Sequence, residues 1–169
     1  VCEIVRRVSG RSLGTFFRDE VAGPLGLDFW IGLPDEQHTR VVPLVPIGLP
    51  PGVDLGLPPE QMPGMMEMMK MMMGPDSLIA RALTAPGGAF SSMDIWEDPH
   101  LWRAELGAAN GITNAPSLAK LYAATVGEVD GLRLLSEDTL ARAIEPQVSG
   151  PDAVLLGVEI PFGLGFMRQ

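Results

Sequence analysis

Two residues whose types and spacing could do chemistry are Ser117 and Lys120, which lie three positions apart on a predicted helix. In a Ser-x-x-Lys pair, a neutral lysine removes the serine proton so that the hydroxyl can attack a carbonyl carbon. The apolar positions that define the predicted buried face of this helix are Leu118, Leu121, Tyr122 and Thr125. Lys120 falls nearly opposite that face, and a lysine that faces water stays charged and is a poor base. The pattern therefore favours a surface lysine over a catalytic pair, and no catalytic residue is predicted.

The histidines and the cysteine give no pattern typical of a metal or redox centre. His38 and His100 are far apart and neither belongs to a His-x-x-x-His or His-x-His motif, so surface or capping roles are favoured over zinc binding or catalysis. The single cysteine, Cys2, rules out an internal disulfide and lies on the apolar side of a predicted helix, where a buried structural thiol is expected. We therefore predict no metal site and no cofactor.

Composition sets limits on the class of protein. The 169 residues are 46% hydrophobic, which is enough for one domain with a core. A formal net charge of −9 argues against nucleic acid or an anionic membrane as partner, because both require a basic surface. No apolar run approaches the roughly 20 residues of a membrane-spanning helix. The sequence lacks a signal peptide, but a missing N-terminus would explain that equally well; the compartment stays open, with a slight lean toward the cytoplasm.

The elements that would position a site begin with helices. Apolar residues in positions 1–8 recur at helical spacing, and Gly10 suits the left-handed residue that closes a helix. Ser12 is a natural N-cap for a second helix, which should end at Gly23-Pro24. The predicted buried face of that helix consists of Leu13, Phe16, Phe17 and Val21.

The middle of the chain is irregular. Eight prolines in residues 33–64 forbid sustained helix, and so long a loop is usually functional or disordered. Residues 65–73 are almost all methionine, a flexible side chain that can repack around varied apolar groups. We weigh a lid or wall over an acyl pocket, which would include Met69, against ordinary packing or a mobile segment; soft-metal binding is disfavoured.

Further helices and two strands are predicted after the methionine-rich run. Helices are expected over residues 76–82, from a Thr113 or Asn114 cap to residue 126, and after Ser136. Residues 153–160 and 162–166 are typical of strands. We expect a single partial domain over 1–169, divided into helices (1–32), a Pro-rich loop with the Met-rich segment (33–75), a helical region (76–145) and strands (146–169).

Four phrases in order carry a family resemblance. They are Gly-Arg-Ser-Leu-Gly-Thr-Phe-Phe with its closing Gly-Pro-Leu-Gly-Leu (10–27), Asn-Gly-Ile-Thr-Asn-Ala-Pro-Ser-Leu-Ala-Lys-Leu-Tyr (110–122), Gly-Leu-Arg-Leu-Leu-Ser (131–136) and Phe-Gly-Leu-Gly-Phe (162–166). Together the sequence resembles the serine β-lactamase-like hydrolases, which include penicillin-binding-protein-like proteins and β-lactamase-fold esterases. The resemblance implies an α+β fold, part of a β-lactamase/transpeptidase-like domain with an antiparallel sheet flanked by helices. This slice should be mostly helices and loops with one or two C-terminal strands.

The resemblance also implies a chemistry. A longer parent protein, of which this chain would be a part, would hydrolyse a small ester or β-lactam through an acyl-enzyme, and esterase or lipase activity is favoured. The family's Ser-x-x-Lys, Tyr-x-Asn and His-x-Gly or Lys-Thr-Gly motifs are expected outside this chain, which alone should be inactive and self-associate. Asn110 and Gly111 are either a plain turn or a loop that walls the substrate cleft, and Trp102 either packs or lines a pocket. The alternative is a non-enzymatic binding module that uses the methionine-rich surface.

Overall fold

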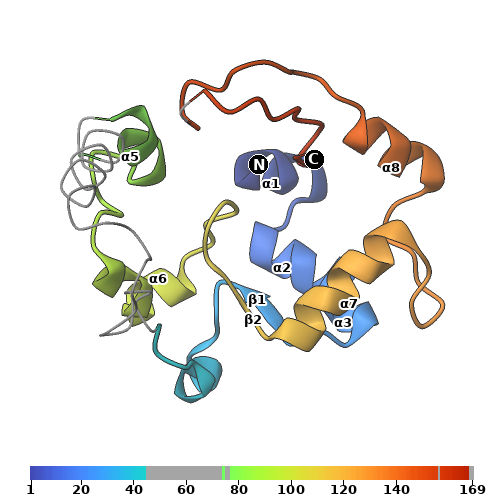
Figure 1. Cartoon of the computed structure of the whole chain (residues 1–169). Helices are drawn as coiled ribbons and strands as arrows, with labels where there is room; N and C mark the ends of the chain where they lie inside the picture. Colours follow the sequence, from blue (N-terminus) through green and yellow to red (C-terminus); the bar gives the residue numbers. More distant parts are fainter. Residues whose placement is uncertain (45–73, 75–76, 156, 168–169) are drawn as a thin grey trace, which may run out of the picture. The chain divides into compact units, whose positions relative to one another are not determined.

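The computed structural model describes residues 1–44, 74, 77–155 and 157–167 (Figure 1). Its contacts divide the chain into two compact units, which we describe separately: unit 1 comprises Val1–Leu44 and Asp94–Ala143, and unit 2 comprises Val45–Met93 and Ile144–Gln169. The methionine-rich run at 65–73, Met69 included, and the proline-rich stretch from residue 45 onward lie outside the described residues. Predictions made for those residues stay predictions.

Helix α1 (Cys2–Ser9) opens unit 1 and ends as expected. Gly10 adopts a left-handed conformation with φ of 72°, and its N–H donates to the Arg6 carbonyl. The predicted apolar stripe, however, is only partly covered. Cys2 and Val5 are half-buried, whereas the large apolar side chains on the adjoining side, Val1, Ile4 and Val8, are exposed.

The second helical segment runs further than the sequence predicted. Ser12 caps α2 (Leu13–Phe17), which continues through the π-helical turn η1 (Arg18–Ala22) into α3 (Gly23–Leu25). The Gly23 N–H donates to the Arg18 carbonyl in the wide π turn, and Pro24 then stands at the start of α3, where a missing N–H costs little. The segment ends instead at left-handed Gly26.

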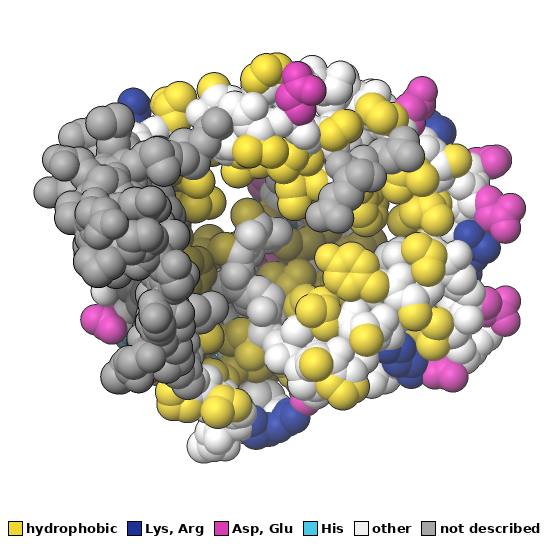
Figure 2. Space-filling view, viewed as in Figure 1, with side chains coloured by type: hydrophobic (Ala, Val, Ile, Leu, Met, Phe, Trp, Pro, Cys, Tyr) yellow, Lys and Arg dark blue, Asp and Glu magenta, His cyan; other side chains and the backbone are white. Residues whose placement is uncertain are grey.

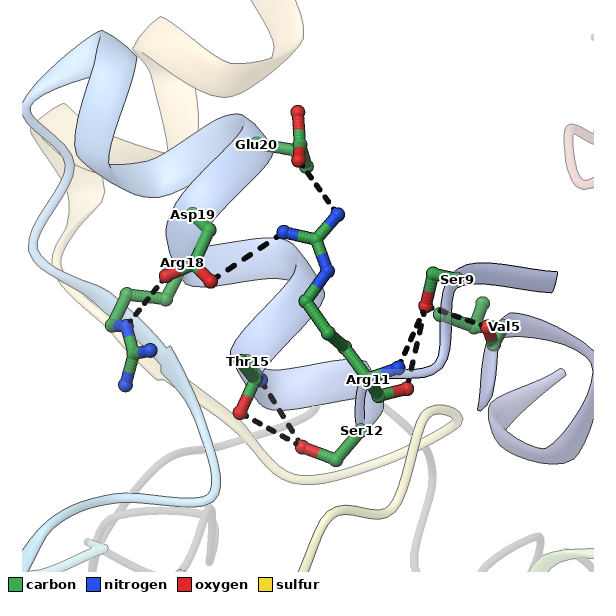
Figure 3. A network of polar contacts seen from close by, with 8 residues as sticks. All are labelled: Val5, Ser9, Arg11, Ser12, Thr15, Arg18, Asp19 and Glu20. Atoms are coloured by element: carbon green, nitrogen blue, oxygen red, sulfur yellow. Dashed lines mark hydrogen bonds and ion pairs between the residues drawn. The ribbon is translucent and has the colours of Figure 1, made fainter. Parts of the chain in front are cut away.

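A polar network fixes the approach to this segment (Figure 3). The Arg11 guanidinium donates to Glu20 at 2.6 Å and to Asp19 at 3.5 Å, and it lies 5.1 Å from the centre of the Phe16 ring. Arg11, which precedes the Ser12 cap of α2, is thereby joined to the π turn that follows that helix. Arg11 is half-buried, but both of its acidic partners are exposed, so the network orients the chain more than it stabilises it.

A two-stranded antiparallel sheet lies in unit 1. Strand β1 (Phe29–Ile31) pairs with β2 (Gly111–Thr113), so that Trp30 is opposite Ile112. The predicted α+β class is confirmed, but the strands lie here and not at the C-terminus. Three-residue strands are too short for an alternating pattern to stand out in the sequence.

Helix α7 (Ala115–Val126) follows β2 directly. The Asn114 side chain accepts a hydrogen bond from the Ser117 N–H, and Pro116 occupies the first turn as expected. The predicted buried face was only partly right: Leu121 and Thr125 are half-buried, but Leu118 is 40% and Tyr122 59% exposed. The buried residues of the helix are Ser117 and Ala124. Small residues occupy the contact face because the helix approaches other backbone closely. The Ala124 carbonyl, for example, accepts a hydrogen bond from the Leu134 N–H at 2.8 Å.

Shorter elements complete unit 1. The turn after α7 has positive φ at Asp130 and Gly131, and the Ser136 hydroxyl accepts from the Thr139 N–H at the start of α8 (Glu137–Ile144). Helical turn η2 (Asp35–Arg40) lies in the stretch expected to be irregular, whereas helical turn η3 (Met93–Glu97) and helix α6 (Pro99–Arg103) lie in the region expected to be helical. No helix among the described residues is long and apolar enough to cross a membrane.

In unit 2, helix α5 (Leu78–Leu83) is capped by Ser77, close to the predicted position. Where two C-terminal strands were predicted, the described residues form turns and isolated bridges. Asp152 accepts hydrogen bonds from the Val154 and Leu155 N–H groups and turns the chain where the first strand was expected. Isolated bridges replace the strands, pairing Phe162 with both Val148 and Met167.

Candidate functional site

The Ser-x-x-Lys sequence on α7 has structural partners. The buried Ser117 hydroxyl accepts a hydrogen bond from the Asp28 N–H at 2.9 Å, which ties the helix to the residue before β1. The Lys120 ammonium lies 2.6 Å from the Asp130 carboxylate in the turn after the helix. The serine therefore faces β1, and the half-buried lysine is held at the following turn.

Asn110 closes a loop that we call the Asn110 loop (residues 101–110). Its side chain is buried, and Oδ1 accepts a hydrogen bond from the Leu106 N–H at 2.9 Å. Nδ2 donates to the Leu101 carbonyl at 2.8 Å and to the Ala104 carbonyl. Both amide hydrogens are thus used within the loop. Asn110 can shape a site through the backbone that it holds, but its side chain has no donor left for a ligand.

Trp102 lies near the start of this loop and Gly111 directly follows it, both within unit 1. Gly111 pairs with Ile31, and a Cβ atom added to it would lie 2.7 Å from the Phe29 ring. The Trp102 indole donates to the Trp96 carbonyl at 2.7 Å and packs edge-to-face against His38, with ring centres 5.2 Å apart. Of the predicted site residues the structure brings together these two and Asn110, whereas Met69 lies outside the described residues.

The remaining chemistry-bearing side chains have local roles. His38 is half-buried, with Nε2 3.4 Å from the Leu33 carbonyl oxygen and 3.5 Å from Asp35. His100 is exposed on α6. The half-buried Cys2 thiol is directed at the Glu105 carbonyl at 3.6 Å. Within the part of the chain that the structure describes, no cluster of three or more His, Cys, Asp or Glu residues could hold a metal.

Asp28 is a structural centre that the sequence did not reveal. Its carboxylate accepts from the Trp30 indole at 3.0 Å, the Arg40 guanidinium and the Asn114 amide at 3.2 Å. Its carbonyl accepts from the Thr113 hydroxyl at 2.9 Å. Asp28 therefore joins β1, β2, η2 and the start of α7. The only local signal is the i to i+2 spacing with Trp30; the other partners are distant in sequence.

The surroundings keep Asp28 ionised. Hydrogen bonds from Arg40 and then Trp30 hold the pKa of the carboxyl below its usual range, against a smaller opposing effect of burial. Beside it lies an open depression of about 160 Å³. The residues that line this depression are Asp28, Trp30, Leu33, Gln37, Arg40, Val41, Val42, Ile112, Thr113 and Asn114.

Comparison with known proteins defines the class to which this fold and site correspond. The Beta-lactamase family model matches residues 2–169, and the chain belongs to that family. It is 34% identical to a penicillin-binding protein homologue from Caulobacter crescentus, with a TM-score of 0.66, over 99% of this chain and 39% of that one. It is 25% identical to EstA from Arthrobacter nitroguajacolicus Rue61a, with a TM-score of 0.70, over 99% of this chain and 41% of that one.

One curated relative carries both esterase and β-lactamase in its name. The chain is 28% identical to the esterase/beta-lactamase LipL of Mycobacterium tuberculosis, over 96% of this chain and 36% of LipL. The chain therefore spans well under half the length of these relatives. The family predicted from the four sequence phrases is confirmed.

Proposed function

We propose that this chain is part of a serine hydrolase that cleaves a small ester or β-lactam through an acyl-enzyme. In that reaction a serine Oγ attacks the carbonyl carbon and its proton passes through a neighbouring base to the oxygen or nitrogen of the bond that breaks. An ester then releases its alcohol, whereas the amine of an opened β-lactam ring stays attached to the acyl group. Water then attacks the acyl-enzyme and releases the acid. The observation that carries the proposal is the family match over residues 2–169. Esterase chemistry is favoured because EstA and LipL both carry esterase-type names.

The nucleophile, in this proposal, is not Ser117. A catalytic serine needs a base within hydrogen-bonding reach, but Ser117 accepts from the Asp28 N–H and Lys120 pairs with Asp130. The family's own Ser-x-x-Lys and its two partner motifs would lie outside these residues. Consistent with this, the chain spans only 36–41% of the relatives described above. The 169-residue chain alone is therefore expected to be inactive.

Unit 1 would contribute a wall of the substrate cleft. The Asn110 loop, Gly111 and Trp102 would supply the shape of that wall, while the reacting groups come from elsewhere. Because the Asn110 amide is fully used inside the loop, the wall would act through backbone and apolar surface. The alternative of a methionine-lined binding module rests on residues 65–73, which lie outside the described part of the chain.

Turnover measurements test the proposal. Three substrates, p-nitrophenyl acetate, p-nitrophenyl butyrate and nitrocefin, are offered to the 169-residue chain and to its Ser117→Ala variant. They are also offered to the longer product, the protein encoded by the whole reading frame that contains this chain. We expect hydrolysis by the longer product, faster with the esters than with nitrocefin, and none by the chain alone. Hydrolysis by the chain that disappears in Ser117→Ala would contradict the proposal.

A further inference from the structure

The Glu105 side chain links the Asn110 loop to the start of α2. Oε1 accepts a hydrogen bond from the Ser12 hydroxyl at 2.7 Å, and Oε2 accepts from the Gly14 N–H at 2.9 Å. These partners are 93 and 91 residues away in sequence. The carboxylate is half-buried, and both of its oxygens are engaged by the same helical turn. The contact therefore joins two distant parts of unit 1 at two points.

Two glycines leave the space that this carboxylate occupies. A Cβ atom on Gly14 would lie 2.8 Å from Glu105 Oε1 and 2.1 Å from the Ile31 carbonyl oxygen. A Cβ atom on Gly32 would lie 3.0 Å from Glu105 Cγ. A side chain at either position would displace the carboxylate or the backbone around it. The local backbone is thus shaped around Glu105.

The backbone of Glu105 lies inside the hydrogen bonds that Asn110 makes. The Asn110 amide bonds to the residues on either side of Glu105: it donates to the Ala104 carbonyl and accepts from the Leu106 N–H at 2.9 Å. Asn110 closes the loop on itself, whereas Glu105 attaches the closed loop to α2. Without Glu105 the loop would keep its internal hydrogen bonds but lose this two-point attachment.

We infer that Glu105 is the positioning residue of the Asn110 loop, acting through Asn110 and not by contact with a substrate. That the loop is a substrate wall rests on the proposed function; that Glu105 holds the loop does not. Hydrogen exchange of the chain itself therefore tests the inference without any turnover, and a failed activity assay leaves it standing.

The experiment compares amide exchange in the chain and in the variants Glu105→Ala, Glu105→Gln and Glu128→Ala, the last a control at an exposed carboxylate. Glu105→Ala should speed exchange at Gly14, whose N–H loses its acceptor, by about 10- to 100-fold, the effect of losing a hydrogen bond to a charged group. The N–H groups of Leu106, Ala109 and Asn110 keep their acceptors within the loop, but they should exchange on the order of 10-fold faster because the unattached loop opens more often. Glu105→Gln should bring the exchange rates back to within about threefold of those in the unmodified chain, because the glutamine amide can accept from the Gly14 N–H and donate to the Ser12 oxygen. Glu128→Ala should change nothing there.

Two results would overturn the inference. Unchanged exchange at residues 106–110 in Glu105→Ala would show that the loop needs no attachment to α2. Equal acceleration in the loop and throughout α7 would show that Glu105 stabilises the whole unit and positions nothing in particular. Acceleration confined to the loop and Gly14, with recovery in Glu105→Gln, supports it.

Discussion

Replacement of Gly111 by alanine tests the packing at the predicted wall. A Cβ atom there would lie 2.7 Å from Phe29 Cε2 and 3.0 Å from Cζ, closer than ordinary carbon contacts. Phe29 cannot yield freely, because its ring packs edge-to-face on Phe17 with centres 4.9 Å apart. Overpacking of this kind costs about 1–3 kcal/mol. In a chain of this size that corresponds to a fall in Tm of roughly 2–4 °C per kcal/mol.

Urea unfolding followed by tryptophan fluorescence measures the effect, since Trp30 lies in the adjoining strand. The matched control is Gly127→Ala, where the nearest atom to the new Cβ is 3.7 Å away and neither glycine has a positive φ. Adding Phe29→Leu should offset part of the Gly111→Ala loss, with a coupling energy of about 1 kcal/mol. Equal stability of Gly111→Ala and Gly127→Ala would refute the packing argument.

Three further outcomes are expected. Because the pKa of Asp28 is lowered in the folded chain, its contribution to stability is complete above the usual aspartate range and is lost as pH falls through the folded-state pKa. In an acid titration, the free energy of unfolding of Asp28→Asn should therefore fall less steeply than that of the unmodified chain. Leu25→Ala should cost about 2–5 kcal/mol by urea unfolding, because the Leu25 side chain is 1% exposed. The chain should self-associate through apolar side chains that reach the surface (Figure 2), and should therefore elute above monomer size in gel filtration. A monodisperse monomer would contradict this. The exposed apolar side chains of unit 1 include Val1, Ile4, Val8, Leu118, Tyr122 and Val126.

The helix boundaries could be predicted because their signals are local. Gly10, Ser12 and Asn114 act through backbone groups within four residues, and each occupies the capping position that its residue type favours. An end at Gly23-Pro24 was predicted, but the helical segment continues past this proline through a π turn and ends at Gly26. Propensity alone does not reveal such a turn.

The site could be predicted only in part, for the opposite reason. Asn110, Gly111 and Trp102 all lie in unit 1, and their part in a substrate site stays a prediction. Glu105 and Asp28 were missed, because most of their partners are many residues away and no spacing rule connects them. The buried face of α7 was also only partly predicted: Leu121 and Thr125 are half-buried, but the fully buried residues are the small Ser117 and Ala124.

Covalent labelling measures the central claim most directly. The chain and the longer protein encoded by its whole reading frame are each treated with a fluorophosphonate, which phosphonylates activated serines with loss of fluoride. The intact mass of each protein is measured first, and the labelled serine is then located by peptide mapping. The account predicts one adduct on the longer product, at a serine outside these 169 residues, and none on the chain alone. An adduct on Ser117 in either protein would contradict it.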